Sequence, residues 1–202
     1  MLFARPSARS ARASDDPEAR RLRRFEGEIL PHLDAAYDLA RWLCREADAA
    51  EDVVQEAMLR AFRAYDGRRD GGARAWLLAI VRNCHLDWRA RNRRRRVEIA
   101  VAAPAGDGDG EEGDAFAAFP AEGDPESYLL AVGETDAVHR TLARLSETHR
   151  EILVLRDLED CSYREIAEVL AVPIGTVMSR LARARKAFAE LWSVETGEGG
   201  AP

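Results

Sequence analysis

The stretch CSYREIAEVLAVPIGTVMSRLARARKAFAEL, residues 161–191, decides the fold of the C-terminal part of this chain. Ser162 and Glu165 form the S-x-x-E pattern of a capping box, which predicts a helix start just before an apolar run. After a short break, Pro173 is well placed as the first residue of a second helix. A capped helix, a tight turn and a second helix at this spacing are typical of a helix-turn-helix.

The second helix of this motif has one apolar face and one polar, basic face. The apolar residues recur at helical spacing and are expected to pack inward: Val177, Leu181, Ala184 and Phe188. The other face carries Thr176, Ser179, Arg180, Arg183 and Lys186. Such a helix can enter a major groove and present its N-terminal half to base edges, while flanking residues hold phosphates. The alternative is an ordinary helical hairpin with a solvated basic face.

Helical periodicity also extends through the rest of the chain. Before the motif, an apolar stripe ends at Leu145, and Ser146 has the character of an N-cap. The N-terminal half contains three further helical patterns, and Asp48 with Glu51 is a plausible capping start for the second of them. No strand-like alternation is long enough to predict a sheet. The fold class is therefore expected to be all-α, with two small helical domains.

Composition divides the chain into five segments. The expected segments are a disordered basic tail (1–24), a first helical domain (25–96), an acidic linker (97–124), a helix-turn-helix domain (125–193) and a short tail (194–202). The linker is rich in Gly, Pro, Ala and acid, so it cannot bury enough apolar surface to offset the entropy of ordering. We therefore expect a flexible connection between the two domains.

Composition also excludes several classes of protein. The net charge of −6 is not that of a nucleic-acid binder, but arginines cluster locally, above all across Arg89–Arg96. No apolar run approaches the ~20 residues of a membrane span, and the N-terminus lacks the apolar core of a secretory signal. Three separated cysteines, Cys44, Cys84 and Cys161, form no CxxC pair, so neither a zinc site nor a disulfide framework is expected.

Three segments in order resemble the sigma-70 family of bacterial RNA polymerase sigma factors, in particular the extracytoplasmic-function group. They are ADAAEDVVQEAMLRAFRAYD (47–66), ARAWLLAIVRNCHLDWRARNRRRR (73–96) and LSETHREILVLRDLEDCSYREIAEVLAVPIGTVMSRLARARK (145–186). The resemblance covers most of residues 25–193. It implies a transcription initiation factor without enzymatic activity or cofactor, which brings core RNA polymerase to promoters in the bacterial cytoplasm, recognises their −10 and −35 elements and assists melting.

The resemblance assigns the first segment to the polymerase. In the family this helix docks on the clamp helices of the β′ subunit, and the positions that match are Asp48, Glu51, Asp52, Gln55 and Glu56. An acidic surface beside an apolar one suits a basic helical partner. The alternative is a solvated acidic helix face.

The second segment matches the element that reads and melts the −10 region. The matching residues that lie near DNA are Arg74, Arg82, Asn83, His85 and Arg89. Asn83 is the best candidate for a contact to a base, and the loop 66–74 matches the loop that captures an extruded base. Trp76 is expected in the core rather than as a stacking platform. The arginines up to Arg96 neutralise phosphates.

The helix-turn-helix matches the reader of the −35 element. Base edges are reached in the family from the positions of Met178, Ser179, Ala182 and Arg183. Phosphate contacts are expected from Thr176, Arg180, Arg185 and Lys186, and at the first helix from Ser162, Tyr163 and Arg164. Met178 departs from the group, where a basic residue is frequent, and a methionine cannot make a bidentate contact to guanine.

The resemblance also implies partners. These are core polymerase, through the β′ clamp helices and the β flap, promoter DNA and an anti-sigma factor. Two roles for the acidic linker stay open: it either mimics nucleic acid in the polymerase active-site channel or is a solvated tether. The competing hypotheses for the whole chain are a free-standing regulator with a LuxR-type helix-turn-helix and an enzyme. No nucleotide-binding loop, metal cluster or nucleophile elbow supports the latter.

Overall fold

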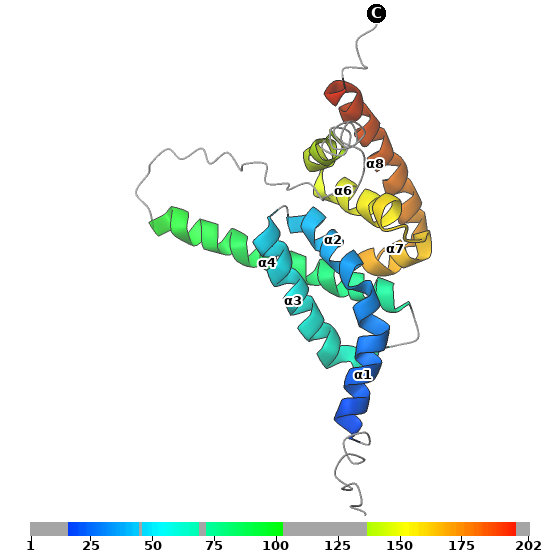
Figure 1. Cartoon of the computed structure of the whole chain (residues 1–202). Helices are drawn as coiled ribbons and strands as arrows, with labels where there is room; N and C mark the ends of the chain where they lie inside the picture. The colour runs from blue at the N-terminus through cyan, green and yellow to red at the C-terminus, as the bar shows by residue number, and fades with distance from the viewer. Residues whose placement is uncertain (1–15, 45, 69–71, 103–136, 197–202) are drawn as a thin grey trace, which may run out of the picture.

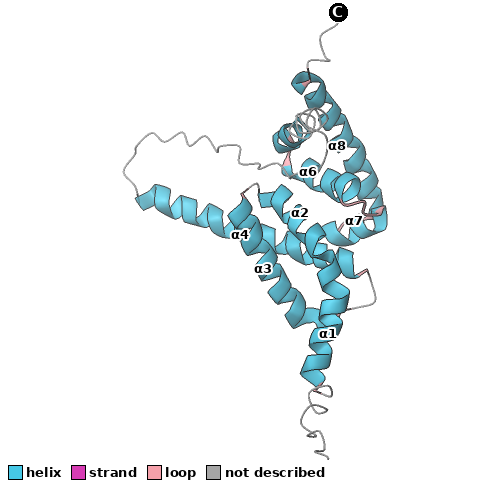
Figure 2. Cartoon of the chain, in the orientation of Figure 1, coloured by secondary structure: helices cyan, strands magenta, loops and turns pink. Residues whose placement is uncertain are grey.

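The computed structural model describes residues 16–44, 46–68, 72–102 and 137–196, and every regular element in these ranges is helical (Figure 2). The all-α class is therefore confirmed. An N-terminal and a C-terminal group of helices lie against each other, and the end of the longest helix projects away from both (Figure 1). Most of the expected linker lies outside the described residues, although the longest helix continues beyond Arg96 to Ala102.

The N-terminal group is a bundle in which three helices pack against one another and a fourth closes one end. The helices are α1 (Pro17–Ile29), α2 (Leu33–Cys44), α3 (Ala47–Ala64) and α4 (Ala73–Ala102), with short 3-10 turns η1 (Leu30–His32) and η2 (Tyr65–Gly67). Fully buried side chains such as Leu39, Val53 and Leu78 fill its core. Each such side chain contributes about 1.5–3 kcal/mol by leaving water.

Helix α1 begins inside the segment 1–24 that was expected to be a disordered tail. Its start is fixed by Pro17 at the first helical position and by Asp16, whose carboxylate accepts a backbone N–H at 3.1 Å. Further along, Arg21 pairs with Asp66 at 2.6 Å and so ties α1 to η2, the turn that follows α3. The expected tail is therefore too long, because local capping and a distant ion pair order residues from Pro17 onward.

Two other helix starts differ from the expected ones, that of α3 by two residues and that of α8 by one. Helix α3 begins at Ala47 after Glu46, whose side chain makes no capping bond, so Asp48 lies within the first turn. Pro173 is the N-cap of α8 rather than its first residue, with an extended backbone and no side chain to offer the helix. Neither helix start has a side-chain capping hydrogen bond. Helix ends without such a cap commonly shift by one or two residues from the position that a sequence pattern indicates.

The C-terminal group contains the helix-turn-helix on a platform of shorter helices. Residues 137–144 are helical, followed by α6 (Glu147–Leu153), a π-helical turn η3 (Val154–Leu158), α7 (Tyr163–Leu170) and α8 (Ile174–Glu195). The expected cap at Ser146 is confirmed, since its hydroxyl accepts the N–H of His149. The capping box is confirmed as well: Ser162 and Glu165 exchange both side-chain-to-backbone bonds.

The tight turn between α7 and α8 depends on one residue in a left-handed conformation. Ala171 has a φ of 52° and a ψ of 47°, and its N–H bonds back to carbonyls of the last turn of α7. For an L-residue with a Cβ this conformation costs roughly 1–2 kcal/mol. The strain is therefore concentrated at the residue that sets the angle between the two helices of the motif.

Replacing Ala171 by glycine is expected to stabilise the protein. The substitution Ala171→Gly removes the left-handed strain, and after the added entropy of the unfolded glycine chain a net gain of about 0.5–1 kcal/mol remains. The control Ala189→Gly, at an exposed position inside α8, is expected to destabilise by about 0.8–1 kcal/mol. Urea unfolding measures both. Equal losses in the two variants would contradict the role given to Ala171.

Candidate nucleic-acid interface

In α8, the second helix of the helix-turn-helix, the apolar face points inward and the polar face points outward, as the sequence predicts. Val177, Leu181 and Ala184 are buried, and Phe188 is half-buried and stacks on Trp192 with ring centroids 5.8 Å apart. Because these residues anchor α8 on the platform, the opposite face of the helix is left to solvent. That face is the candidate surface for a DNA groove.

The candidate base-reading residues all lie on this open face. Met178, Ser179, Ala182 and Arg183 are exposed. Ser179 donates its hydroxyl to the carbonyl of Thr176 at 3.1 Å, and Arg183 Nε donates to the carbonyl of Ser179 at 3.2 Å. The helix backbone therefore steadies both side chains. The terminal nitrogens of the Arg183 guanidinium project beyond that bond as potential donors.

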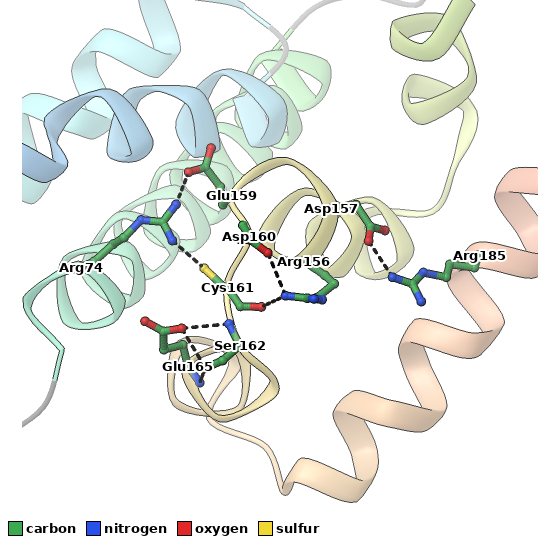
Figure 3. A network of polar contacts seen from close by, with 9 residues as sticks. All are labelled: Arg74, Arg156, Asp157, Glu159, Asp160, Cys161, Ser162, Glu165 and Arg185. Atoms are coloured by element: carbon green, nitrogen blue, oxygen red, sulfur yellow. Dashed lines mark hydrogen bonds and ion pairs between the residues drawn. The ribbon is translucent and has the colours of Figure 1, made fainter.

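The candidate phosphate contacts are less uniform. Lys186 and Arg164 are exposed, and each lies near a carboxylate of its own helix; Thr176 and Arg180 are half-buried. Arg185 pairs with Asp157 at 2.6 Å (Figure 3), which holds α8 on η3. Tyr163 is exposed. The hydroxyl of Ser162 is engaged with Glu165 at 2.7 Å in the capping box, so its first role is structural.

The acidic face of α3 is open to solvent. Asp48, Glu51, Asp52 and Gln55 are exposed, while the opposite face of α3 is buried in the bundle. Glu56 differs from these four, since it is half-buried and pairs with Arg60 at 2.7 Å. Arg60 in turn pairs with Asp87 of α4 at 2.6 Å. The charge of Glu56 is thus partly neutralised by Arg60 within the bundle.

Helix α4 is fixed in rotation by its buried stripe. Leu77, Leu78, Val81 and Cys84 are at most 1% exposed and pack into the N-terminal bundle. This rotation turns the basic residues of α4 toward the C-terminal group. Helix α7 of that group packs against α4. Half-buried Trp76 packs against the core, as the sequence predicts.

Four of the five candidate residues of α4 pair with carboxylates of the C-terminal group. Arg74 Nη2 lies 2.6 Å from Glu159 Oε2, and the same guanidinium donates to the Cys161 thiol at 3.4 Å (Figure 3). Arg82 Nε donates to Glu151 Oε1 at 2.7 Å. His85 and Arg89 continue this row of contacts along α4.

His85 and Arg89 share one carboxylate, that of Glu147. His85 Nε2 lies 3.3 Å from Glu147 Oε1, and Arg89 forms an ion pair with the other oxygen. On its other side, His85 Nδ1 lies 3.4 Å from the Cys44 thiol. The tautomer with hydrogen on Nε2 satisfies both contacts, with the thiol donating and Glu147 accepting.

Asn83 is the exception among the α4 candidates, because it is exposed. The arginines that follow Arg89 are largely exposed as well, up to Arg95. Of the loop expected to capture a base, 66–68 and 72–74 are described, and Arg68 lies over the ring of Trp76 at 5.9 Å. One part of the candidate −10 surface is therefore accessible, and the other is covered.

Burial and local charge perturb the groups at this contact. Burial, and then the positive charges of Arg89, Arg150 and Arg82, lower the pKa of His85 to about 4, so its imidazole is neutral at pH 7. Burial raises the pKa of Glu151 and of Glu159, and the guanidinium groups that face them oppose this effect. Burial also raises the pKa of Cys44 to about 12 and that of Cys161 to about 11, so both are thiols.

The three glutamates are functional candidates that the sequence reasoning missed. Glu147 and Glu151 are four residues apart, about one helical turn, and their partners His85 and Arg82 are three residues apart on α4. That complementary spacing is the signal in the sequence. It indicates two charged faces, but it does not identify each as the partner of the other.

An apolar hollow of about 230 Å³ opens between the platform and α8. It is lined by Val138, Leu142, Leu153, Asp157, Leu158, Arg185 and Phe188. Leu158 is also among the most exposed large apolar side chains. The hollow has the chemistry of a docking site for an apolar side chain from another protein.

Metal and membrane chemistry find no support in the described ranges. No group of three or more His, Cys, Asp or Glu side chains there has the arrangement of a metal site. Among the same residues, no helix is long and apolar enough to cross a bilayer.

Comparison with known proteins places both halves of the chain. Residues 29–95 match the family model "Sigma-70 region 2", and residues 135–188 match "Sigma-70, region 4". The chain is 34% identical over 173 residues to the RNA polymerase sigma-H factor of Pseudomonas aeruginosa, covering 82% of this chain and 84% of that one. It is 36% identical over 139 residues to the ECF RNA polymerase sigma-E factor of Escherichia coli K12, covering 68% and 70%.

Solved structures give the same picture. The sigma factor RpoE of Bartonella quintana, solved with the anti-sigma factor NepR, aligns with a TM-score of 0.64 and 28% identity, over 84% of this chain and 97% of that one. CnrH, solved with the cytosolic domain of CnrY, aligns with a TM-score of 0.58 and 24% identity, over 92% and 94%, and shows the same fold.

The titration of His85 tests the contact between the two groups of helices. We expect its NMR resonances to titrate near pH 4, well below the ordinary value of about 6.5. Because the unfolded chain takes up the proton first, the stability that neutral His85 contributes is present above pH 6.5 and is lost as pH falls toward 4. The difference in unfolding free energy between wild type and His85→Gln therefore shrinks from pH 7 to pH 5. An imidazole that titrates near 6.5 would show that Glu147 and Cys44 do not enclose it.

Proposed function

This chain belongs to the extracytoplasmic-function group of the sigma-70 family, and we propose that three of its helical surfaces divide the work of promoter-specific initiation. The function of the chain as a whole is that of a transcription initiation factor that brings RNA polymerase to promoters. The match to region 2 removes the free-standing regulator as an alternative.

Helix α8 reads the −35 element. The observation that supports this role is the open face of α8, where Met178, Ser179, Ala182 and Arg183 are exposed opposite the buried anchor residues. Arg183 reads a guanine through its terminal nitrogens, and Met178 offers apolar contact to a thymine methyl group. Thr176, Arg180, Lys186, Arg164 and Tyr163 hold the backbone around them.

Helix α4 reads and helps to melt the −10 element. Asn83 contacts a base, while Arg74, Arg82, His85 and Arg89 lie along the strand, and the exposed arginines beyond them neutralise phosphates. Four of these residues pair with glutamates in the present conformation. This role therefore requires that the C-terminal group move away from α4.

Two surfaces serve the polymerase. The acidic face of α3, with Asp48, Glu51, Asp52 and Gln55, suits the basic clamp helices of the β′ subunit, with Glu56 at its edge. The apolar hollow beside α8 suits an apolar side chain of the β flap. When the chain is bound to the polymerase at both surfaces, its two DNA-reading helices are held near each other. Binding of one promoter element then raises the local concentration of the other.

Regulation and location follow from the family. RpoE of Bartonella quintana was solved with an anti-sigma factor, and we propose that this chain also has one. Its place of action is the bacterial cytoplasm, where polymerase and chromosome are. Its activity is one of binding, and the proposal includes no catalytic step and no cofactor. For the acidic linker, both proposed roles stay open: a mimic of nucleic acid and a solvated tether.

Reconstitution tests the proposal directly. The chain is mixed with sigma-free core polymerase and a promoter library, and transcripts are sequenced. Specific starts that share two spaced elements are expected. A set of transcripts no different from that of core polymerase alone would refute promoter recognition.

Charge reversal on α3 is expected to weaken polymerase binding. The double variant Glu51→Lys/Asp52→Lys places positive charge against a basic partner, and we expect about tenfold weaker affinity for core polymerase, mainly through slower association. Fluorescence anisotropy with labelled chain measures this. Glu168→Lys/Glu190→Lys, which changes two exposed carboxylates of the C-terminal group, is the control. Equal losses in both pairs would show that net charge rather than the α3 face matters.

Removal of the Arg183 side chain is expected to relax specificity at one base pair. Arg183→Ala loses a bidentate contact worth about 1–3 kcal/mol, so promoters with and without the preferred −35 base become similar. Lys186→Ala is the control, since loss of a phosphate contact weakens all promoters alike. Transcription from a −35 library measures both. A uniform loss in Arg183→Ala would reassign this residue to the backbone.

A further inference from the structure

A row of carboxylates in the C-terminal group holds the basic side of α4. We name this set of contacts the latch: Glu147, Glu151 and Glu159 with Arg74, Arg82, His85 and Arg89. All its acidic members come from the group that carries the −35 reader, and all its basic members are candidates for the −10 reader. Two halves of one DNA-reading protein therefore neutralise each other.

The inner part of the latch is shielded from water, whereas the side chains of its outer pair, Arg89 and Glu147, are 44% and 28% exposed. The Glu159 and Glu151 side chains are 7% and 10% exposed, and that of His85 is 3% exposed. By contrast, the pair between Arg60 and Asp87 within the N-terminal bundle is 38% and 56% exposed. Shielded charges with good hydrogen-bond geometry fix one arrangement strongly, since a misplaced partner leaves a buried charge uncompensated.

Apolar and aromatic contacts complete the same interface. Trp42 of α2 packs on His139 with ring centroids 4.8 Å apart, and Cys44 of α2 touches His85. Cys161, which receives the bond from Arg74, is fully buried. The contact is thus a packed surface with a specific polar centre.

We propose that this carboxylate surface is a docking site for the chain's own α4, where it takes the place of DNA phosphates until promoter DNA displaces it. The proposal rests on the role given above to α4 in reading DNA. Carboxylate oxygens bind guanidinium groups with the same fork geometry as phosphate oxygens, so the two ligands exclude each other. The free chain is then closed by itself, with no second protein required.

The closed arrangement covers the DNA-contacting residues of α4 and leaves the other proposed binding surfaces accessible. The −35 face of α8 and the acidic face of α3 are exposed while the latch is formed. The apolar hollow beside α8 is open as well. Polymerase can therefore bind the closed chain, and the −10 reader becomes available only when the C-terminal group moves off α4.

A closed state lowers the apparent affinity for DNA in proportion to its population. The apparent dissociation constant equals the intrinsic one divided by the fraction of open chain. If a tenth of the chains are open, opening them all tightens binding on the order of tenfold. Removing the carboxylate charges is the direct way to produce that change.

The test combines a distance measurement with DNA binding on the full chain. Donor and acceptor dyes are attached through Arg63→Cys and Ala189→Cys, which are exposed positions on α3 and α8, whereas the three native thiols are buried. The latch variant is Glu147→Gln/Glu151→Gln/Glu159→Gln. The control, Glu18→Gln/Glu26→Gln/Glu46→Gln, removes the same charge from exposed carboxylates that do not pair with the candidate DNA contacts.

We expect high energy transfer in wild type and control and low transfer in the latch variant. The latch variant is also expected to bind a single-stranded −10 oligonucleotide on the order of tenfold more tightly than the control. Unchanged transfer in the latch variant, or low transfer already in wild type, would overturn the latch. Low transfer in the variant without tighter DNA binding would overturn the inhibitory role and the assignment of α4 to DNA, while leaving the contact itself in place. Circular dichroism verifies that each variant is folded.

Discussion

The burial of one apolar stripe on α4 governs the rest of the structure. Leu77, Leu78, Val81 and Cys84 lock this helix into the N-terminal bundle, and the lock sets which way every other side chain of α4 points. Since a helix has a fixed angle of about 100° per residue, the basic residues cannot turn independently of the stripe. The side of α4 that a C-terminal partner or DNA meets is therefore determined inside the core.

The latch is better understood as a device for specificity than as a source of stability. Burying charges costs several kcal/mol per ion, and their attraction at best offsets that cost when hydrogen bonds are well made. The apolar contacts supply the favourable term, while the charges select the partner. Carboxylates can be displaced by phosphates without any change in the cores of the two helical groups. A contact of this kind holds firmly and yet opens as a unit.

Much of the fold was predictable because its signals are local. The capping box at Ser162, the cap at Ser146 and the inward face of α8 all follow from residues within a few positions of one another, and all are confirmed. The early start of α1 has local signals in Asp16 and Pro17, but the ion pair that ties this helix to the bundle, between Arg21 and Asp66, joins residues far apart in the chain and was not predictable. The candidate residues of α8 and α3 lie on the expected open faces, with Glu56 partly engaged elsewhere.

The pairing of α4 with the C-terminal group could not be inferred from the sequence. Periodicity shows that Arg82 and Glu151 lie on polar faces, but water is an adequate partner for each. Which two faces meet depends on contacts between groups of helices that lie far apart in the chain. The sequence pattern therefore predicts each surface alone, and only the packed structure joins them.

The pairing also means that this chain carries its own counterions. A DNA-binding protein normally gains affinity because its arginines release small cations condensed on the phosphates. Here Arg74, Arg82 and Arg89 are already neutralised by glutamates, so the closed chain has fewer cations to release. Its attraction to the roughly 10⁶–10⁹ non-specific sites of a genome is correspondingly weak. The free factor is thereby spared from loss to the chromosome and stays available to the polymerase.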